Sequence, residues 1–470
     1  MTEDLTWLPA WRIAALVAAR EVSPIEVTQH FLDRIEKLDS TLHAFAHLDA
    51  AGALEQAKRA EDDVANGETL GTLHGVPFAV MEMTRVKGMP SIPWGSESCS
   101  ADDLVVERLR AAGAIVVGTT NSYYFKPEDR PRNPWNLDRD TGNSSRGSAA
   151  AVSGGLLPFT LAQDGAGSTR LPAAWNGLLG LHPSRGLIPH INYEKPGLLF
   201  GVSVGPITRD ARDAAVITQA IAGPDGRDFL SIQDEPRDYL AALDKGVSGL
   251  RIAWTDDFGW SSIYHREESV AVVAASRRSA FEFRSLGAAV NTTTEVWGNS
   301  LGAFFALQGA MKRMSPDLPV DLKEVQGRNA AYDVALGLEP EEQTAVVDVP
   351  EATAADYEAA ALERKRLWST TMRVFDSNDI IASPTTLLLP KTFEEWGLQG
   401  RDLIFTSYAA HTALFNLLGF PALTVPCGFI DGLPVGMQLV ARPGREDLLF
   451  RAAKSFLDAF PRPERPAVAC

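Results

Sequence analysis

The sequence predicts an α/β fold in which helices flank a sheet with substantial parallel character. Two stretches each join a helix that ends at a glycine to a short strand directly after it. They are Asp103–Ala112 with Ala114–Val117, and Val270–Ser285 with Ala288–Val290. Strands that alternate with helices are typical of parallel βαβ units. At 470 residues, the chain is long enough for one large α/β unit or two to three ordinary domains.

The first strong helical signal begins at Ser23. The stretch Ser23-Pro24-Ile25-Glu26 is a capping-box pattern with proline at the first helical position. Apolar residues then follow at helical spacing: Val27, Phe31, Ile35 and Leu38. A helix is therefore expected from Pro24 onward.

The second half of the chain adds strands and a closing helix. Short apolar runs predict strands at Leu250–Trp254, Ile380–Ser383, Ala422–Val425 and Pro434–Ala441. Asp431-Gly432 lies between the last two runs and is typical of a hairpin turn. Glu446–Phe460 is expected to form the last helix, followed by a loose, proline-rich tail over residues 461–470.

Composition narrows the classes of partner. The net charge is −16, from 60 acidic and 44 basic residues, which argues against a nucleic-acid or anionic membrane surface. Cys99, Cys427 and Cys470 are far apart, and the eight histidines show no metal-ligand spacing, so neither a disulfide framework nor a metal or organic cofactor is expected. Without a secretory signal or a run of 18 apolar residues, a cytoplasmic location is expected.

Residues 140–189 are dominated by Gly, Ser and Ala, and they contain two small-residue turns. The first, residues 142–148, leads into an alanine-rich helix, and the second covers residues 164–170. Such turns allow several backbone N–H groups to point into one concavity, which can bind a phosphate or serve as an oxyanion hole beside a serine. Taken alone, each turn favours a glycine loop for tight packing.

Taken together, the two turns and their flanking motifs resemble the amidase signature family. Ser168, in a G-x-G-S-x-R pattern, lies 24 residues after Ser144 of a paired-serine loop. Further matching segments run in family order: EVSPIEVTQHFLDRIEKLDSTLHAF, LHGVPFAVME, GTTNSYYF, NPWN, GLLGLHPSRGLIP and NLLGFPALTVPCGFIDGLPVGMQLVAR. The resemblance covers nearly the whole chain.

The resemblance implies one large domain over residues 1–470. Its fold would be a mixed, mostly parallel twisted sheet with helices on both faces. The core signature region would cover about residues 70–195. A variable helical substrate region, helical in composition, would cover about residues 295–362.

The resemblance also implies an amidase that cleaves small amides with a Ser–Ser–Lys triad. Ser168 matches the nucleophile, and Ser144 matches the bridging serine, which the family reaches through a cis peptide bond. The backbone N–H groups that match the oxyanion hole belong to Gly165, Ala166, Gly167 and Ser168. The residues that match supporting positions are Ser145, Asp164, Arg170 and Asn143.

One catalytic position departs from the family. The lysine at the end of the G-V-P strand, which would accept the proton that Ser144 relays, is Met81 in this chain, and Glu82 follows where the family has Asp. The serine loop carries Asn143 and Arg146 where the family prefers glycine. Two further family lysines are replaced by Thr119 and His182.

Three interpretations of Met81 remain open at this point. It is an engineered substitution in an ordinary amidase, or the chain is a natural hydrolase that works without this lysine. In the second case esters or carbamates are favoured, because amide cleavage depends most on protonation of the leaving amine, and Lys87 or Glu82 would be the nearest substitutes for the base. In the third interpretation, the chain is a degenerate relative that binds a ligand or a partner without catalysis.

Aromatic residues near the motifs predict the substrate pocket. Trp94, Tyr123 with Tyr124, and Trp175 indicate an apolar or aromatic acyl group. For Arg146 we expect a solvated side chain rather than a contact with an anionic substrate. The resemblance adds a possible homodimer, with a small-molecule amide as the substrate.

Overall fold

The computed structural model describes residues 4–91, 98–122, 130–190, 202–260, 267–304, 306–307, 353–398, 401–462 and 464–469. Three residues assigned to the substrate pocket or its neighbourhood lie outside the described residues: Trp94, Tyr123 and Tyr124. Most of the helical region predicted over residues 295–362 also lies outside them, from residue 308 to residue 352.

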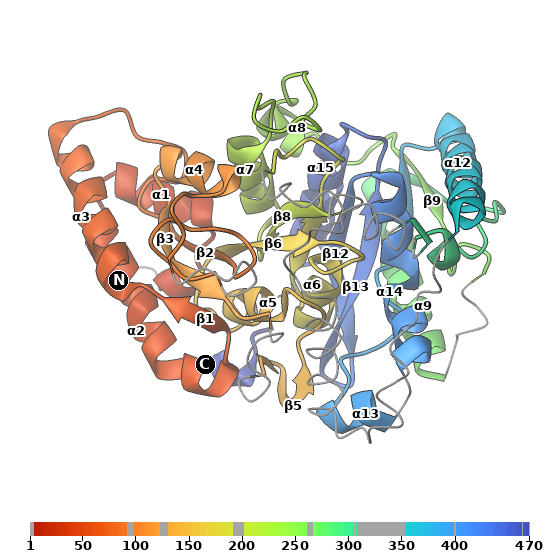
Figure 1. Ribbon diagram of the computed structural model, residues 1–470, viewed down its shortest axis with the longest axis horizontal. Coiled ribbons are helices and arrows are strands. Elements are labelled where there is room, and N and C mark those ends of the chain that lie inside the picture. The colour runs from red at the N-terminus through yellow and green to blue at the C-terminus, as the bar shows by residue number, and fades with distance from the viewer. Residues whose placement is uncertain are drawn as a thin grey trace.

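A large mixed sheet forms the centre of the described part of the molecule (Figure 1). Its strand order is β1-β3-β2-β6-β8-β7-β12-β13-β11-β9-β10. The bounds are β1 Phe45–Leu48, β2 Pro77–Met81, β3 Ile115–Thr120, β6 Phe159–Asp164, β7 Leu179–His182, β8 Ser203–Thr208, β9 Arg251–Trp254, β10 Ala289–Thr292, β11 Ile380–Pro384, β12 Ala422–Ile430 and β13 Leu433–Val440. A small hairpin pairs β4 (Arg132–Asn133) with β5 (Asn136–Asp140).

The sheet has parallel pairs in two separate runs. Strands β3, β2 and β6 are parallel neighbours, and so are β11, β9 and β10. Between these runs, β8, β7, β12 and β13 pair antiparallel with their neighbours, and β1 adds an antiparallel edge. The predicted fold class, a mixed sheet flanked by helices, is confirmed, with a longer antiparallel middle than the alternation of helices and strands indicates.

Helices cover the sheet along its whole length. Helices α1 to α4 gather at the end near β1 and β3, whereas α9, α12 and α14 lie at the other end (Figure 1). The bounds are α1 Ala10–Ala18, α2 Pro24–Leu42, α3 Ala50–Asn66, α4 Leu104–Ala111, α5 Arg146–Ser153, α6 Arg170–Asn176, α7 Ala211–Ile221, α8 Tyr239–Leu243, α9 Glu267–Glu282, α12 Ala354–Ser377, α13 Phe393–Leu398, α14 Arg401–Leu418 and α15 Glu446–Ala459. None of the helices described here is long and apolar enough to cross a membrane.

Local sequence signals explain several element boundaries. The capping box at the start of α2 is confirmed: Ser23 Oγ accepts from Glu26 N, and the Glu26 carboxylate accepts from Ser23 N. The hairpin between β12 and β13 is also confirmed, because Asp431 and Gly432 both have positive φ (50° and 77°), as a tight two-residue turn requires. The predicted strands at β9, β11 and β13 agree with the structure within about two residues.

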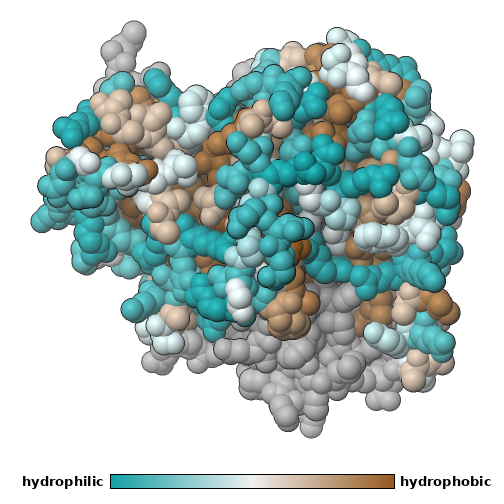
Figure 2. Space-filling model, turned by 90° about the horizontal axis from the view of Figure 1, so that it is seen from above, coloured by the Kyte–Doolittle hydropathy of each residue, from teal (hydrophilic) through white to brown (hydrophobic). Residues whose placement is uncertain are grey.

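The core extends over both faces of the sheet, and it buries every residue of β2, β3, β6 and β7. Strands buried on both faces place their end residues in a desolvated environment, so chemistry at those ends is shielded from water. From above, hydrophilic residues cover much of the surface, and hydrophobic residues lie in small separate groups (Figure 2).

The prediction of a loose tail is wrong for the described part of residues 461–469. The guanidinium carbon of Arg465 lies 4.9 Å from the centroid of the Trp7 ring, and Val468 packs against the main core. Trp7 comes from the N-terminal segment, so contacts between the two ends of the chain order the tail. A cation over an aromatic face stabilises such an exposed contact by about 0.5–1 kcal/mol.

Candidate active site

The carboxyl ends of β2 and β6 bring the predicted site residues to one edge of the sheet. The two strands are parallel, with Val80 opposite Leu161. Met81 is the last residue of β2, and the loop from Asp164 to Arg170 follows β6 directly. Adjacent parallel strands end at the same edge, which is where α/β folds place their chemistry.

A buried ion pair braces the loop that carries Ser168. The Asp164 and Arg170 side chains are fully buried, and Arg170 Nε donates to Asp164 Oδ2 at 2.9 Å while Nη2 donates to Oδ1 at 3.0 Å. Arg170 Nη1 also donates to Gln438 Oε1 at 2.6 Å. Asn416 Nδ2 donates to both Asp164 O (2.9 Å) and Oδ1 (2.8 Å). The buried charges are thus paired and hydrogen-bonded, as burial requires.

Electrostatics hold this brace in its charged form. Burial alone would raise the pKa of Asp164, but the charge and hydrogen bonds of Arg170 outweigh it and lower that pKa well below its ordinary value of 3.8. The pKa of His182 is lowered to about 3 by burial and by the nearby Arg170 charge. His182 is therefore a neutral member of the network at neutral pH.

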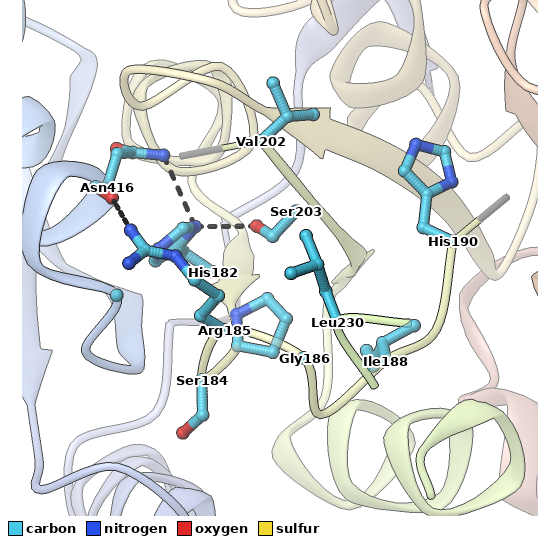
Figure 3. Close-up of a pocket in the computed structure, with 12 residues that line it drawn as sticks. His182, Ser184, Arg185, Gly186, Ile188, His190, Val202, Ser203, Leu230 and Asn416 are labelled. Atoms are coloured by element: carbon cyan, nitrogen blue, oxygen red, sulfur yellow. Dashed lines mark hydrogen bonds between the residues drawn. The ribbon is translucent and has the colours of Figure 1, made fainter. Parts of the chain in front are cut away.

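His182 links the brace to strand β8. Its Nδ1 lies 2.6 Å from Ser203 Oγ and 3.4 Å from Asn416 Nδ2 (Figure 3). These three residues line a small cavity of about 20 Å³, large enough for about one water molecule. The histidine that replaces a family lysine thus fills a buried polar position without bringing in a second charge.

The loop after β6 supplies backbone donors, but not all four that the resemblance implies. Gly167 N donates to Asp164 Oδ1 at 2.6 Å, so that group braces the loop instead of facing a substrate. Within the described residues, the N–H groups of Gly165, Ala166 and Ser168 have no hydrogen-bond acceptor. Of the four N–H groups predicted for an oxyanion hole, these three are therefore unpaired among the described residues, and the prediction stays a prediction. Thr412 Oγ1 of α14 donates to Ala166 O at 2.7 Å, which ties the loop to α14.

The serine loop before α5 is mostly buried. Ser144 is 9 % exposed and Ser168 is 7 % exposed. Among the described residues, neither hydroxyl oxygen has a hydrogen-bond partner. Asn143 Oδ1 accepts from Ser144 N at 2.9 Å. The cis peptide bond implied before Ser144 is absent from the described part of the chain, where every peptide bond is trans.

Met81 contacts the serine loop through Ser145. It is 1 % exposed, and its sulfur lies 3.5 Å from Ser145 Oγ. Ser145 Oγ also donates to Gln163 O of β6 at 3.1 Å, which ties the serine loop to the strand that leads to Ser168. A thioether is only a weak acceptor and binds no proton at neutral pH, so the Met81 side chain supplies no general base.

Neither Glu82 nor Lys87, the two residues predicted as substitutes for the base, forms a hydrogen bond with the Ser144 or Ser168 hydroxyl among the described residues. Glu82 is 4 % exposed, and its Oε1 accepts from Ser122 N at 2.7 Å and from Ser122 Oγ. Lys87 is an exposed residue beyond the end of the strand. No three His, Cys, Asp or Glu side chains within the described residues are placed to hold a metal ion.

Two expectations for side chains near the site change in the structure. Arg146 is not solvated: it is 4 % exposed and its guanidinium contacts protein groups. Trp175 is 1 % exposed, donates from its indole nitrogen to Leu388 O at 2.8 Å and packs 4.6 Å from the Tyr408 ring. Trp175, a residue of α6, therefore lies in a buried cluster with Leu388 and Tyr408.

Sequence reasoning missed the residues that the C-terminal half contributes. Asn416, Gln438 and Thr412 lie about 250 residues beyond the loop they support. The segments NLLGFP and GMQLV belong to the family motifs, and their polar members, Asn416 and Gln438, are the available signal. A buried Asn or Gln inside an apolar segment is itself unusual, because it must find partners in the core.

Comparison with known proteins agrees with this geometry. The chain matches the Amidase family over residues 26–450. It is 34 % identical to the acylamidase of Rhodococcus erythropolis, over 97 % of this chain and 96 % of the relative. It is 31 % identical to a Glutamyl-tRNA(Gln) amidotransferase chain of Moorella thermoacetica, over 96 % of each.

Solved structures show the same relationship. A bacterial aryl acylamidase of the amidase signature family superposes with a TM-score of 0.82 at 27 % identity, over 98 % of both chains. The fold, the order of the motifs and the paired-serine and G-x-G-S loops all agree with that family. The chain therefore belongs to the amidase signature family, whose members are amidohydrolases that act on carbon–nitrogen bonds.

Proposed function

We propose that the chain is a serine hydrolase that forms an acyl-enzyme at Ser168, with Ser144 as the proton relay and no lysine base. Its substrate is a small amide, as for acylamidase relatives, and aryl esters or carbamates of the same acyl group react faster. The observation that carries the proposal is the contrast between an intact, buried oxyanion loop and a thioether at the base position.

The loop chemistry supports acylation. Ser168 Oγ attacks the carbonyl carbon, and the N–H groups of Gly165, Ala166 and Ser168 stabilise the oxyanion. Each such donor contributes about 10²–10³-fold in rate. Small residues and the Asp164–Arg170 brace hold these donors in place before the substrate arrives, so no reorganisation is needed during the reaction.

Proton transfer distinguishes substrates in this site. The Ser168 proton passes to Ser144 Oγ, and Ser144 gives its own proton to the departing nitrogen, so that the amine leaves neutral. Water then attacks the acyl-enzyme, its proton returns through Ser144 to Ser168 Oγ, and the acid is released. A positioned general base is worth about 10²–10⁴-fold. An aryloxide leaves without being protonated, and the proton from Ser144 then passes to solvent water. The site is therefore expected to favour an activated ester over the matched amide.

A fluorophosphonate probe tests the nucleophile. It should label wild-type protein at Ser168, as located by peptide mass spectrometry. The variant Ser168→Ala should lose all labelling while keeping its fold by circular dichroism. Folded wild-type protein that takes up no label would overturn the proposal and favour a ligand-binding relative without catalysis.

Paired substrates test the proton step. Steady-state hydrolysis of 4-nitrophenyl acetate and of 4-nitroacetanilide should differ by about 10²-fold or more beyond their difference in alkaline solution. Both activities should disappear in Ser168→Ala, which controls for esterase activity elsewhere on the surface. Equal enhancement of the amide and the ester would show that another group already acts as the base.

A further inference from the structure

Arg146 is a charged residue buried where the family's serine loop carries glycine. It is 4 % exposed and is the first residue of α5. A cation at a helix N-terminus faces the positive end of the helix dipole, and a buried charge is unfavourable unless it is paired and hydrogen-bonded. Its placement therefore requires compensating contacts, and these identify what it holds.

Two nitrogens of the Arg146 guanidinium bind the same residue of the serine loop. Arg146 Nε and Nη2 donate to Gly142 O at 3.1 and 2.7 Å. Asp140 Oδ1 accepts from Gly142 N at 2.7 Å and lies 3.4 Å from Arg146 Nε. The Asp140 and Arg146 side chains are each 5 % exposed. The buried Asp140–Arg146 pair thus hydrogen-bonds both the N–H and the carbonyl of Gly142, which lies two residues before Ser144.

Gly142 is also pressed against the helix that follows the nucleophile loop. Its φ is +124°, and a Cβ added to it would lie 2.7 Å from Pro172 Cα of α6. The Gly142 backbone therefore lies between α6 on one side and the Asp140–Arg146 pair on the other. Fixing Gly142 therefore fixes the serine loop relative to the segment that carries Ser168.

A second connection runs toward the strand end that lacks lysine. Arg146 Nη1 lies 3.5 Å from Ser122 O, and Ser122 donates from both its N and its Oγ to Glu82, the residue after Met81. Ser145, next to Arg146, contacts the Met81 sulfur. The guanidinium thus connects the serine loop to the end of β2 without a charged group at position 81.

We propose that Arg146 is a positioning residue: with Asp140 it clamps Gly142 and holds Ser144 in relay geometry beside a strand end that has no lysine. The role assigned to Ser144 rests on the proposed hydrolase function. The clamp itself is a property of the loop and is measurable without turnover.

Three variants of the full chain test the clamp. Arg146→Gly removes the guanidinium, and Arg146→Lys keeps the charge but loses the two-pronged donation to one carbonyl. Arg34→Lys is the matched control, because Arg34 donates to Gly155 O (2.8 Å) and Gly154 O (3.3 Å) at the opposite end of α5. The two readouts are hydrogen exchange of the peptide that covers residues 141–145 and the rate of fluorophosphonate labelling at Ser168.

For Arg146→Gly, exchange at residues 141–145 should rise about tenfold or more, since hydrogen bonds to charged groups are lost. The maximal labelling rate should fall by a similar factor, while the probe concentration that gives half of that rate stays unchanged. Arg146→Lys should fall between wild type and Arg146→Gly. Arg34→Lys should leave both readouts at residues 141–145 and Ser168 as in wild type.

The results distinguish the proposed role of Arg146 from the proposed hydrolase function. If Arg146→Gly folds and shows wild-type exchange and wild-type labelling, the clamp is wrong and the hydrolase stands. If wild-type protein is not labelled but exchange still rises only at residues 141–145 in Arg146→Gly, the clamp stands and the hydrolase is wrong. If Arg146→Gly does not fold, Arg146→Lys decides by the same two readouts.

Discussion

The two halves of the candidate site are built differently. The Asp164–Arg170 loop keeps the family sequence and is braced by a fully buried ion pair with amide partners from α14 and β13. The half formed by Met81 and the Ser144 loop departs from the family at several positions at once and is held by Arg146. Under the proposed function, the retained half would stabilise charge on the substrate, and the half that departs from the family would move protons.

The largest expected effect is on the rate of amide hydrolysis, when a lysine is placed at position 81. Met81→Lys should raise 4-nitroacetanilide hydrolysis by about 10²–10⁴-fold at a pH where the lysine is neutral, because a general base then accepts the relayed proton. The 4-nitrophenyl ester should gain far less. Met81→Leu is the matched control and should leave both rates near wild type. An unchanged or lower amide rate in Met81→Lys would show a site rebuilt around a different proton path.

Among the ion pairs compared, the buried Asp164–Arg170 pair should contribute most to the free energy of unfolding. Asp164→Ala leaves the Arg170 charge buried without its partner, which costs about 3–5 kcal/mol in the free energy of unfolding. Urea denaturation measures the loss. Glu55→Ala, which breaks an exposed pair with Arg59, should change stability by less than about 1 kcal/mol. Comparable losses in the two variants would contradict the structural role of the buried pair.

The next expected effect follows from adding a side chain at Gly167, in the loop that carries Ser168. A Cβ at Gly167 would lie 2.2 Å from Thr412 Oγ1, and the φ of +117° is strained for alanine. Gly167→Ala should therefore shift the loop and lower the Ser168 labelling rate by about 10²–10³-fold, the value of one oxyanion donor. Gly67→Ala is a control for positive-φ strain elsewhere in the chain, because Gly67 has positive φ and no neighbour within 4 Å. It should leave labelling unchanged.

The smallest expected effect at neutral pH comes from His182, whose contribution to stability appears only as the pH falls. Its pKa is lowered from 6.5 to about 3 in the folded chain, so between these values the unfolded chain binds a proton that the folded chain does not. Stability should therefore fall as pH drops from about 6.5 toward 3, with a slope of at most about 1.4 kcal/mol per pH unit from this residue. The variant His182→Gln should flatten the slope of denaturation midpoint against pH. An identical slope in both proteins would remove His182 from the network.

The sequence predicts local features of this molecule far better than distant ones. The capping box at Ser23 and the hairpin turn at Asp431-Gly432 depend on neighbouring residues alone, and both are confirmed. Strands β6, β7 and β8 escape prediction, because buried strands of four to six residues in or beside a Gly/Ser/Ala-rich region show no alternation. The antiparallel pairs that they form therefore could not be foreseen.

The same distinction applies to the site. Ser144, Ser168 and Met81 follow from ordered motifs, whereas the bonding state of Gly167 N and the burial of Arg146 follow only from the folded loop. Arg146 is the clearest case. Arginine is usually solvated, and only the pairing with Asp140 and the carbonyl of Gly142 overrides that preference.

The braces of the Ser168 loop also bear on how the protein folds. Arg170 is bonded to Asn416 and Gln438, which follow it by 246 and 268 residues. Contacts between segments so far apart form slowly, since a long stretch of chain must first be brought together. The Asp164–Arg170 loop therefore cannot reach its final shape until the last third of the chain has docked. Under the proposed function, the capacity of Ser168 to react with the fluorophosphonate probe is expected to appear during refolding after most of the secondary structure.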